Sequence, residues 1–414
     1  MLAPGGKEKV PAYAWLVFAL TFGLLISDYM ARQVLNAVFP LLKVEWGLTD
    51  GQLGFLAGVV PLMVGLLTCP ISWLADRLGR AKSIVAMAVL WSVATLLCGW
   101  ARSYDEMLIA RVLVGVGEAA YGSVGIAVII SVFPKHMRAT LTGAFMAGGL
   151  LGQVLGVGVG GLVAAAHGWR TSFVAIGWIG LVFAAAYAWF VRDSRLTDAS
   201  GSERTNVTLA SLPLLFKGRA LKCAYVGSGL QLFVGGAIPA WLPTYFTRYY
   251  DLPLGKASSL AAIFLALGGV GMVVCGMISD RLVRDANQRA MLSTYYCIGC
   301  AVLTAAAFSF GPGIPQLILL GGAMFLAAAT AGPAGAMVAN LTPAALHGTA
   351  FAVLTLANNA FGLAPGPIVT GWLADRIGLL AAMQWLPAAS LAAALVFFLA
   401  ARSPQPEPIP ATAG

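Results

Sequence analysis

Four ionisable residues lie inside otherwise apolar stretches in the first third of the chain: Asp28 and Arg32 in one stretch, Arg111 and Glu118 in another. A charged side chain costs roughly 2.5–3.5 kcal/mol at the centre of a bilayer, so the four together oppose insertion by about 10–14 kcal/mol unless they pair or line water. Carboxylates can exchange protons and guanidinium groups can hold anions. These residue types therefore indicate proton and anion chemistry within a membrane.

The spacing of these residues places them on defined helix faces. Asp28, Arg32 and Asn36 follow one another at intervals of four residues and so share one face of a helix. Arg111 and Glu118 are seven residues apart, which puts them on one face about 10.5 Å apart along the axis at 1.5 Å per residue. Because consecutive spans run in opposite directions, we expect Asp28 at the depth of Glu118 and Arg32 at the depth of Arg111.

The elements that must position these residues are membrane-spanning helices. Hydrophobic residues make up 59% of the 414 residues, charged residues only 10%, and the mean hydropathy is +0.86. Such a composition leaves too little polar surface for a soluble protein of this length. Apolar stretches of about 20 residues can cross a bilayer, and we predict twelve: 13–38, 51–74, 83–101, 107–133, 139–165, 171–192, 220–247, 256–278, 289–310, 315–339, 346–372 and 379–400.

Charge placement predicts orientation and excludes other classes of protein. Most Lys and Arg residues outside the spans fall in segments that are cytoplasmic if both termini are cytoplasmic, as the positive-inside rule requires of a plasma (bacterial inner) membrane protein. The net charge of +9 is thus a matter of topology, and no nucleic-acid partner is expected. His136, His167 and His347 lie in different predicted loops, so we expect no metal site, no cofactor and no enzymatic activity.

The chain divides into two halves. Between Arg192 and Lys222 the hydropathy lapses into a polar run followed by a short stretch that could lie on the membrane surface. We therefore predict a first six-helix bundle at 1–192, a cytoplasmic linker at 193–222, and a second bundle with a tail at 223–414. Asp-Arg pairs follow both the second and the eighth predicted spans, which indicates a duplicated six-helix unit.

Two motifs carry a family resemblance. The stretch from Ser72 to Arg80, S-x-L-A-D-R-x-G-R, resembles the loop motif after helix 2 of major facilitator superfamily transporters, and Arg111-x-x-x-Gly115-x-Gly117-Glu118 is similar to their helix 4 motif. The segment around Tyr121 resembles Spinster-like proteins and the related anion:cation symporters, which move organic anions. Those families usually carry adjacent Asp and Arg in helix 1, whereas here the carboxylate lies a turn before Arg32.

The resemblance implies an all-α membrane protein of 12 transmembrane helices, in which two six-helix bundles related by a pseudo-two-fold axis work by alternating access. Helices 1, 4, 7 and 10 of such proteins line the central cavity. Charges in the loop after helix 2 lock the cytoplasmic helix ends in the outward-open state. The implied gating residues here are Asp76, Arg77, Gly79, Arg80, Asp280 and Arg281.

We predict that Asp28 and Glu118 exchange a proton while the arginines hold an anionic substrate. Burial favours the neutral form of a carboxylic acid, and a nearby guanidinium favours the charged form, so moving the arginine switches the proton. A static charge pair that only fixes helix packing is the alternative. The candidate substrate-binding residues are Arg32, Arg111, Asn36, Tyr121, Gln231, Trp241, Tyr245, Asn358 and Asn359.

The predicted function is proton-coupled symport of an organic anion by a monomer in the lipid bilayer. Two alternatives remain: Spinster-like transport of a lysolipid or another amphipathic anion, and proton-driven export of a hydrophobic compound. The second half offers few polar candidates, which favours a substrate that is partly apolar. Gly148, Gly152, Gly156 and Gly160 recur every four residues in the fifth span, a pattern that predicts close helix packing.

Overall fold

A computed structural model describes residues 11–193, 209–216, 218–283, 285–343 and 346–403. Within these residues, twelve segments are long and apolar enough to cross a membrane, as the sequence predicts, and no strand occurs. The first six spans are α1 (Ala12–Trp46), α2 (Asp50–Leu78), α3 (Arg80–Trp100), α4 with α5 (Tyr104–Glu118 and Tyr121–Val132), α6 (Lys135–His167) and α7 (Trp169–Phe190). The last six are α8 (Arg219–Tyr249), α9 (Leu254–Leu282), α10 (Ala286–Ser309), α11 with α12 (Ile314–Ala327 and Ala331–Leu341), α13, η4 and α14 (His347–Asn358, Asn359–Leu363 and Pro365–Ile377), and α15 with α16 (Leu379–Gln384 and Leu386–Ala401).

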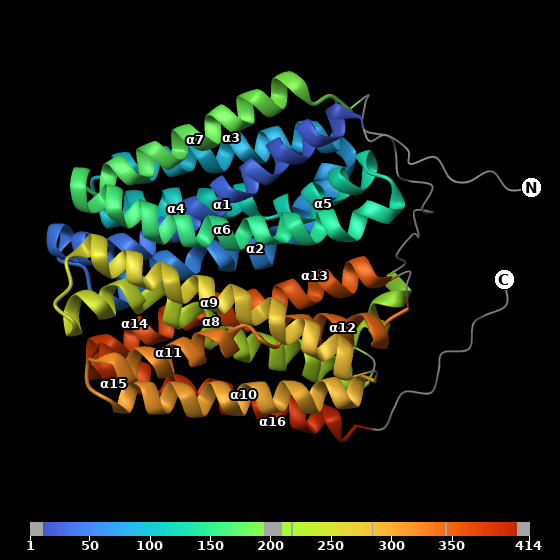
Figure 1. The fold of residues 1–414 in the computed structure, drawn as a ribbon. Coiled ribbons are helices and arrows are strands. Elements are labelled where there is room, and N and C mark those ends of the chain that lie inside the picture. The colour runs from blue at the N-terminus through green and yellow to red at the C-terminus, as the bar shows by residue number, and fades with distance from the viewer. Residues whose placement is uncertain (1–10, 194–208, 217, 284, 344–345, 404–414) are drawn as a thin grey trace, which may run out of the picture.

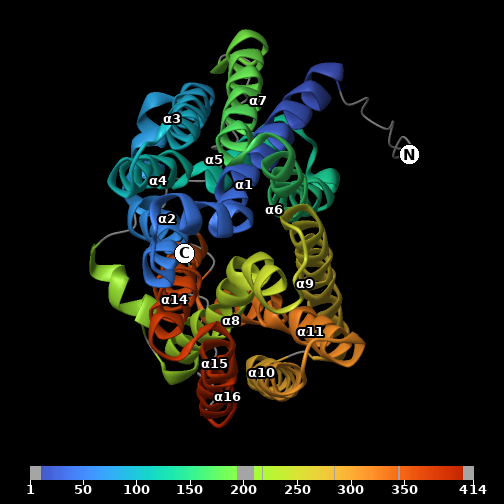
Figure 2. The same cartoon turned by 90° about the vertical axis from the view of Figure 1, so that its left-hand side faces the viewer.

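The helices form two bundles, α1–α7 and α8–α16, which lie one above the other in Figure 1 and face each other across the middle of the molecule in Figure 2. Helix α1 begins and α16 ends at the same end of the molecule, here called the termini side; the other end is the opposite side. Most of the predicted linker lies outside the described residues. Within its described part, Leu209–Phe216 form a short 3-10 helix, η2, and the last residues, from Arg219 on, belong to α8.

Four spans are interrupted, and the last of them, the twelfth, breaks at Trp385, between α15 and α16. The fourth breaks between α4 and α5, where the hydroxyl of Thr68 donates a hydrogen bond to the carbonyl of Ala119 at 2.8 Å. The tenth breaks between α11 and α12, and the eleventh contains a π-helical turn, η4. Carbonyls freed by such breaks need partners inside a membrane. The break after Glu118 leaves that carboxylate at the end of a helix, at the depth where α1 carries its charges.

The glycine repeat of α6 brings this helix against α1. A Cβ atom on Gly152 would lie 2.7 Å from the carbonyl oxygen of Ile26, and one on Gly156 would lie 2.9 Å from that of Met30. Only glycine permits this separation, so the predicted packing role of the repeat is confirmed. The contact holds α1 in place and leaves its polar face directed toward the middle of the molecule.

The two bundles meet through a few helix pairs. Helix α2 packs on α14, α6 on α9, and α1 on α8. On the opposite side, the rings of Phe39 in α1 and Trp241 in α8 lie 5.1 Å apart, and Gly54 of α2 approaches the carbonyl of Pro367 in α14. These contacts close the space between the bundles on the opposite side.

Candidate functional site

Arg32 and Glu118 form an ion pair between the first and fourth spans. The Nε and Nη2 atoms of Arg32 donate to Oε2 of Glu118 at 3.0 and 2.7 Å. The Glu118 side chain is fully buried, whereas that of Arg32 retains 14% of its exposure. Because the guanidinium reaches the edge of a cavity and the carboxylate does not, an anion could approach the pair only from the arginine side.

Asp28 completes this cluster one helical turn before Arg32. It is buried, and its carboxyl group lies within hydrogen-bonding reach of Glu118. Among the described residues, no donor reaches Oδ1 of Asp28 or Oε1 of Glu118. Two carboxyl groups can bond to each other only if one carries a proton. The arrangement therefore provides a place for one proton between two acids beside a guanidinium.

Arg111 lies behind α1 rather than in the cavity. It is fully buried, and its Nε, Nη1 and Nη2 atoms donate to the carbonyls of Leu56, Ala31 and Arg32 at 3.3, 2.9 and 3.1 Å. The guanidinium is thus at the depth of Arg32, as expected from the spacing. In this conformation its contacts join α4 to α1 and α2, and a role as a substrate ligand stays a prediction.

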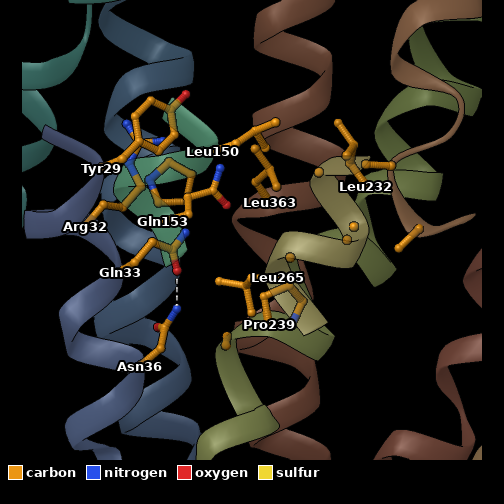
Figure 3. Close-up of a pocket in the computed structure, with 18 of the residues that line it drawn as sticks. Tyr29, Arg32, Gln33, Asn36, Leu150, Gln153, Leu232, Pro239, Leu265 and Leu363 are labelled. Atoms are coloured by element: carbon orange, nitrogen blue, oxygen red, sulfur yellow. Dashed lines mark hydrogen bonds between the residues drawn. The ribbon is translucent and has the colours of Figure 1, made fainter. Parts of the chain in front are cut away.

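A cavity of about 220 Å³ lies between the bundles. Its first wall carries the polar side chains, which come from α1 and α6 (Figure 3). Its second wall, from α8, α9, the α11 end and the eleventh span, carries none among the described lining residues. The polar side chains are Tyr29, Arg32, Gln33, Asn36 and Gln153, and the second wall includes Leu232, Pro239, Leu265, Met272, Met324 and Leu363.

Of the predicted site residues, Arg32 and Asn36 line this cavity. The amide of Asn36 donates to Oε1 of Gln33 at 2.6 Å, and the Arg32 guanidinium lies 5.0 Å from the ring centre of Tyr29. Sequence reasoning missed Tyr29, Gln33 and the α6 residue Gln153. Their signal was local: Tyr29 and Gln33 each follow a charged residue of the α1 stripe, and Gln153 lies between two glycines of the repeat in α6.

Two other candidates serve helix breaks and packing. Tyr121, at the start of α5, donates from its hydroxyl to the carbonyl of Thr21 at 2.6 Å and is fully buried. Gln231 is also buried, and its amide donates to the carbonyl of Ala327 at 3.3 Å, where α11 ends. Neither lines the cavity, so their substrate contacts stay predictions.

The aromatic candidates of α8 form hydrogen bonds within the second bundle. The indole of Trp241 donates to the carbonyl of Pro367 at 3.1 Å, and the hydroxyl of Tyr245 accepts from the amide of Gln316 at 2.9 Å. Both are buried away from the cavity. They hold the eleventh and tenth spans against α8.

The asparagines of the eleventh span flank its π-helical turn. Asn359 begins that turn, and its amide donates to the carbonyl of Thr355 at 2.8 Å. Within the described part of the chain, Oδ1 of Asn358 and Oδ1 of Asn359 are buried without a partner. Neither residue lines the cavity in this conformation, and their binding role also stays a prediction.

The predicted gating residues lie on the termini side. The side chain of Asp76 is outside the described residues. Arg77 stacks over the Trp73 ring at 3.7 Å, Gly79 ends α2 with φ +94°, and Arg80 begins α3. The carboxylate of Asp193 accepts from the backbone N–H of Ala81 at 2.7 Å.

The corresponding pair after α9 also stays within its own bundle. Asp280 pairs with Arg289 at 2.8 Å, and Arg281 is exposed. Among the described residues, no hydrogen bond or ion pair of these two side chains joins the bundles. Their gating role stays a prediction for another conformation.

A second charged cluster, on the opposite side, does join the bundles, and sequence reasoning missed it. Arg248 of α8 donates through both terminal nitrogens to Asp50 of α2 at 2.7 and 2.6 Å, and Lys43 of α1 donates to the same carboxylate at 2.6 Å. The carboxylate of Asp375, in α14, accepts from the backbone N–H groups of Asp50 and Gly51 at 2.7 and 2.8 Å. Lys43, Asp50, Arg248 and Asp375 each lie a few residues outside a predicted span.

Twelve spanning helices and a charged cavity between two bundles define an integral membrane transporter, not an enzyme. A model of the Major Facilitator Superfamily matches residues 21–312. The chain belongs to this superfamily.

Known proteins agree with this assignment. The chain is 26% identical to a "Probable L-galactonate transporter" of Escherichia coli (strain K12), over 74% of this chain and 71% of the relative, and 26% identical to a "Gallate transporter" of Pseudomonas putida, over 73% of each. A bacterial homologue of the human lysosomal transporter Spinster, solved in an inward-facing and unoccupied conformation, shares the fold with a TM-score of 0.83 at 20% identity, over 96% of this chain and 98% of that one. A D-xylose-proton symporter matches with a TM-score of 0.75 at 19% identity, over 93% and 97%.

Proposed function

We propose that this protein is a proton-coupled symporter of an organic carboxylate. The observation that carries the proposal is the position of Arg32, which reaches the cavity edge while both its bonds to Glu118 run to a single oxygen. A substrate anion can therefore compete with Glu118 for Arg32 while a proton competes with Arg32 for Glu118, so that the anion and the proton bind together. Relatives named as transporters of galactonate and gallate support an organic acid as the substrate.

The coupling follows from the hydrogen bonds. Bonds between two charged groups are roughly twice as strong as neutral ones, so protonation of Glu118 weakens its hold on Arg32. The freed guanidinium then offers its planar fork to a substrate carboxylate. When the substrate leaves, Arg32 returns to Glu118 and the proton is released. One anion thus requires one proton.

Several charged groups surround this exchange. Asp28 shares the acid site with Glu118, and Tyr29 packs beside the guanidinium of Arg32. Arg111 contributes a second positive charge on the far side of α1, where its hydrogen bonds to carbonyls keep it in place. Because Arg111 is held by backbone carbonyls, whereas Arg32 is held by a carboxylate that can be protonated, Arg32 is the group that moves.

We further propose that the termini side is cytoplasmic, as the positive-inside rule predicts. With the opposite side closed by Asp50, Arg248 and Asp375, the conformation described here would then face inward. The loop after α2, with Asp76 and Arg77, would close the cytoplasmic side in the other state. Both walls of the cavity come from one chain, which supports a monomer as the working unit.

The cavity favours a small acid over the alternatives. Its volume of about 220 Å³ lies below the roughly 300–1,000 Å³ of sites for drug-sized ligands, and a lysolipid is larger still. The likeness to a Spinster homologue is a likeness of fold. A neutral hydrophobic compound would offer no anion to the guanidinium of Arg32 at the cavity edge.

Uptake into proteoliposomes tests the proposal. Labelled D-galactonate and gallate would be offered from an acidic exterior, with and without a protonophore. We expect at least one acid to accumulate only while the pH gradient lasts. Acid accumulation that ignores the gradient would refute proton coupling, and the absence of any organic-acid uptake or binding would refute the substrate class.

A further inference from the structure

The two walls of the cavity differ in chemistry. The first wall offers one guanidinium, three amides and a phenol, all within α1 and α6 (Figure 3). The second wall presents Leu232, Leu265, Met272, Met324 and other apolar groups. A ligand in this cavity therefore meets polar partners on one side only.

The backbone carbonyl of Ala327 does not supply the polar partner that the side chains of the second wall lack. The carbonyl of Ala327, where α11 ends beside the cavity, already accepts the amide of Gln231 from behind. On the first wall, Gln33 and Asn36 bond to each other and stay beside Arg32. Hydroxyls on the far side of a bound acid would consequently meet no polar side chain among the described lining residues.

We propose that the preferred substrate is a monocarboxylate with an aromatic or other apolar ring, bound with its carboxylate on Arg32 and its ring on the second wall. This proposal rests on the proposed function. Methionine side chains such as Met272 and Met324 adapt to flat rings and make favourable sulfur–aromatic contacts. A hydroxyl buried without a partner lowers affinity by roughly tenfold, so a polyhydroxylated sugar acid loses affinity at several positions.

Calorimetric titration of the detergent-solubilised protein with benzoate, cyclohexanecarboxylate and D-gluconate tests this proposal. We expect the two ring acids to bind at least about tenfold more tightly than gluconate. Met324→Gln, which adds an amide to the second wall, should narrow that difference, whereas Met146→Gln on the exposed face of α6 should leave it unchanged. Equal binding or a preference for gluconate would overturn the proposal while leaving organic-acid transport intact. If no acid binds, the proposed function fails with it.

An independent observation concerns the C-terminal stretches of α2 and α14, which have similar sequences. The last turn of α2 reads Trp73-Leu-Ala-Asp76-Arg77-Leu before Gly79, and that of α14 reads Trp372-Leu-Ala-Asp375-Arg376-Ile before Gly378. The two stretches also share their local structure. Each arginine lies over the tryptophan four residues earlier, at 3.7 and 3.3 Å, and each glycine has positive φ, +94° and +84°.

The two stretches lie at opposite ends of the molecule. In α14 the motif stands on the opposite side, where Asp375 accepts the first two backbone N–H groups of α2. A carboxylate at that position satisfies unpaired donors and faces the positive end of the helix dipole. Close approach is possible because Gly51 has no side chain: a Cβ there would lie 2.8 Å from Oδ2 of Asp375.

We infer that Asp375 acts as a conformational cap. Its carboxylate on the start of α2 holds the opposite side closed in the present conformation. Rocking of the bundles out of this conformation would separate Asp375 from the first N–H groups of α2.

Distances between spin labels on the opposite side test whether Asp375 acts as this cap. Labels at Val44 of α1 and Ile314 of α11, both exposed, would be placed in a background lacking the exposed Cys69. We expect Asp375→Ala to raise the population with the longer distance by about tenfold, because this ratio corresponds to the free energy of one lost helix cap. Arg376→Ala, which spares the carboxylate, should leave that population unchanged. An unchanged distribution in Asp375→Ala, or an equal shift in Arg376→Ala, would overturn the inference.

Discussion

Replacing Glu118 by glutamine tests the coupling most directly. The variant keeps the size of the side chain and an oxygen that can accept from Arg32, but it removes the charge. Both present bonds run from Arg32 to Oε2, and each would become a bond to a neutral acceptor of roughly half the strength. Glu118→Gln thus imitates the protonated state permanently.

The expected size of the effect follows from one proton per anion. A pH difference of about one unit supplies about 1.4 kcal/mol per proton, which corresponds to roughly tenfold accumulation. Without a titrating Glu118, Arg32 is available to the substrate at every pH. Gradient-driven accumulation in Glu118→Gln should fall from about tenfold to about the equilibrium level, while substrate exchange across the membrane persists.

The assay compares wild type and variant in proteoliposomes with an imposed pH gradient, and then in exchange without one. Thermal unfolding in detergent shows whether the variant is intact, since removing one partner of a buried pair outright costs about 3–5 kcal/mol. Full gradient-driven accumulation by a folded Glu118→Gln protein would refute the reasoning. Loss of exchange together with accumulation would show instead that Glu118 is needed for movement itself.

The remaining predictions concern the neighbours of Glu118. Asp28→Asn leaves the Arg32–Glu118 pair in place, so accumulation in the same gradient assay should be reduced but not abolished; an inactive yet folded protein would make Asp28 the essential acid. Arg32→Lys replaces a planar fork with a single point charge, and the Kd for the transported acid, measured by calorimetry, should rise about tenfold. Arg111→Met leaves three carbonyls without this donor and should lower the free energy of unfolding by about 2–4 kcal/mol, seen as a lower Tm, with substrate affinity little changed; a normal Tm with lost binding would make Arg111 a substrate ligand.

Much of the fold was predictable because the signals are local. Hydropathy over about 20 residues identifies a span regardless of its neighbours, and all twelve predicted spans are found. The breaks within the spans were harder to predict. Backbone breaks near Ala119 and in the eleventh span depend on partners such as Thr68, which is distant in sequence.

In the functional site, too, the local features were predictable and the contacts between helices were not. Helical periodicity is enough to place Asp28 and Arg32 on one face and to match their depth with Glu118 on a neighbouring antiparallel helix. It does not say which side of α1 the partner helix occupies. Arg111 and Arg32 were equivalent as candidates in the sequence, yet one donates to backbone carbonyls and the other reaches the cavity.

The amino-acid sequence by itself determined the membrane setting, the number of spans and the identity of the charged residues that must pair, since each follows from composition and short-range spacing. The tertiary structure alone decided that Glu118 holds Arg32, that the second cavity wall is apolar, and that Asp375 meets the start of α2. Those outcomes depend on the directions in which side chains of different helices point, and directions are set only when the helices pack.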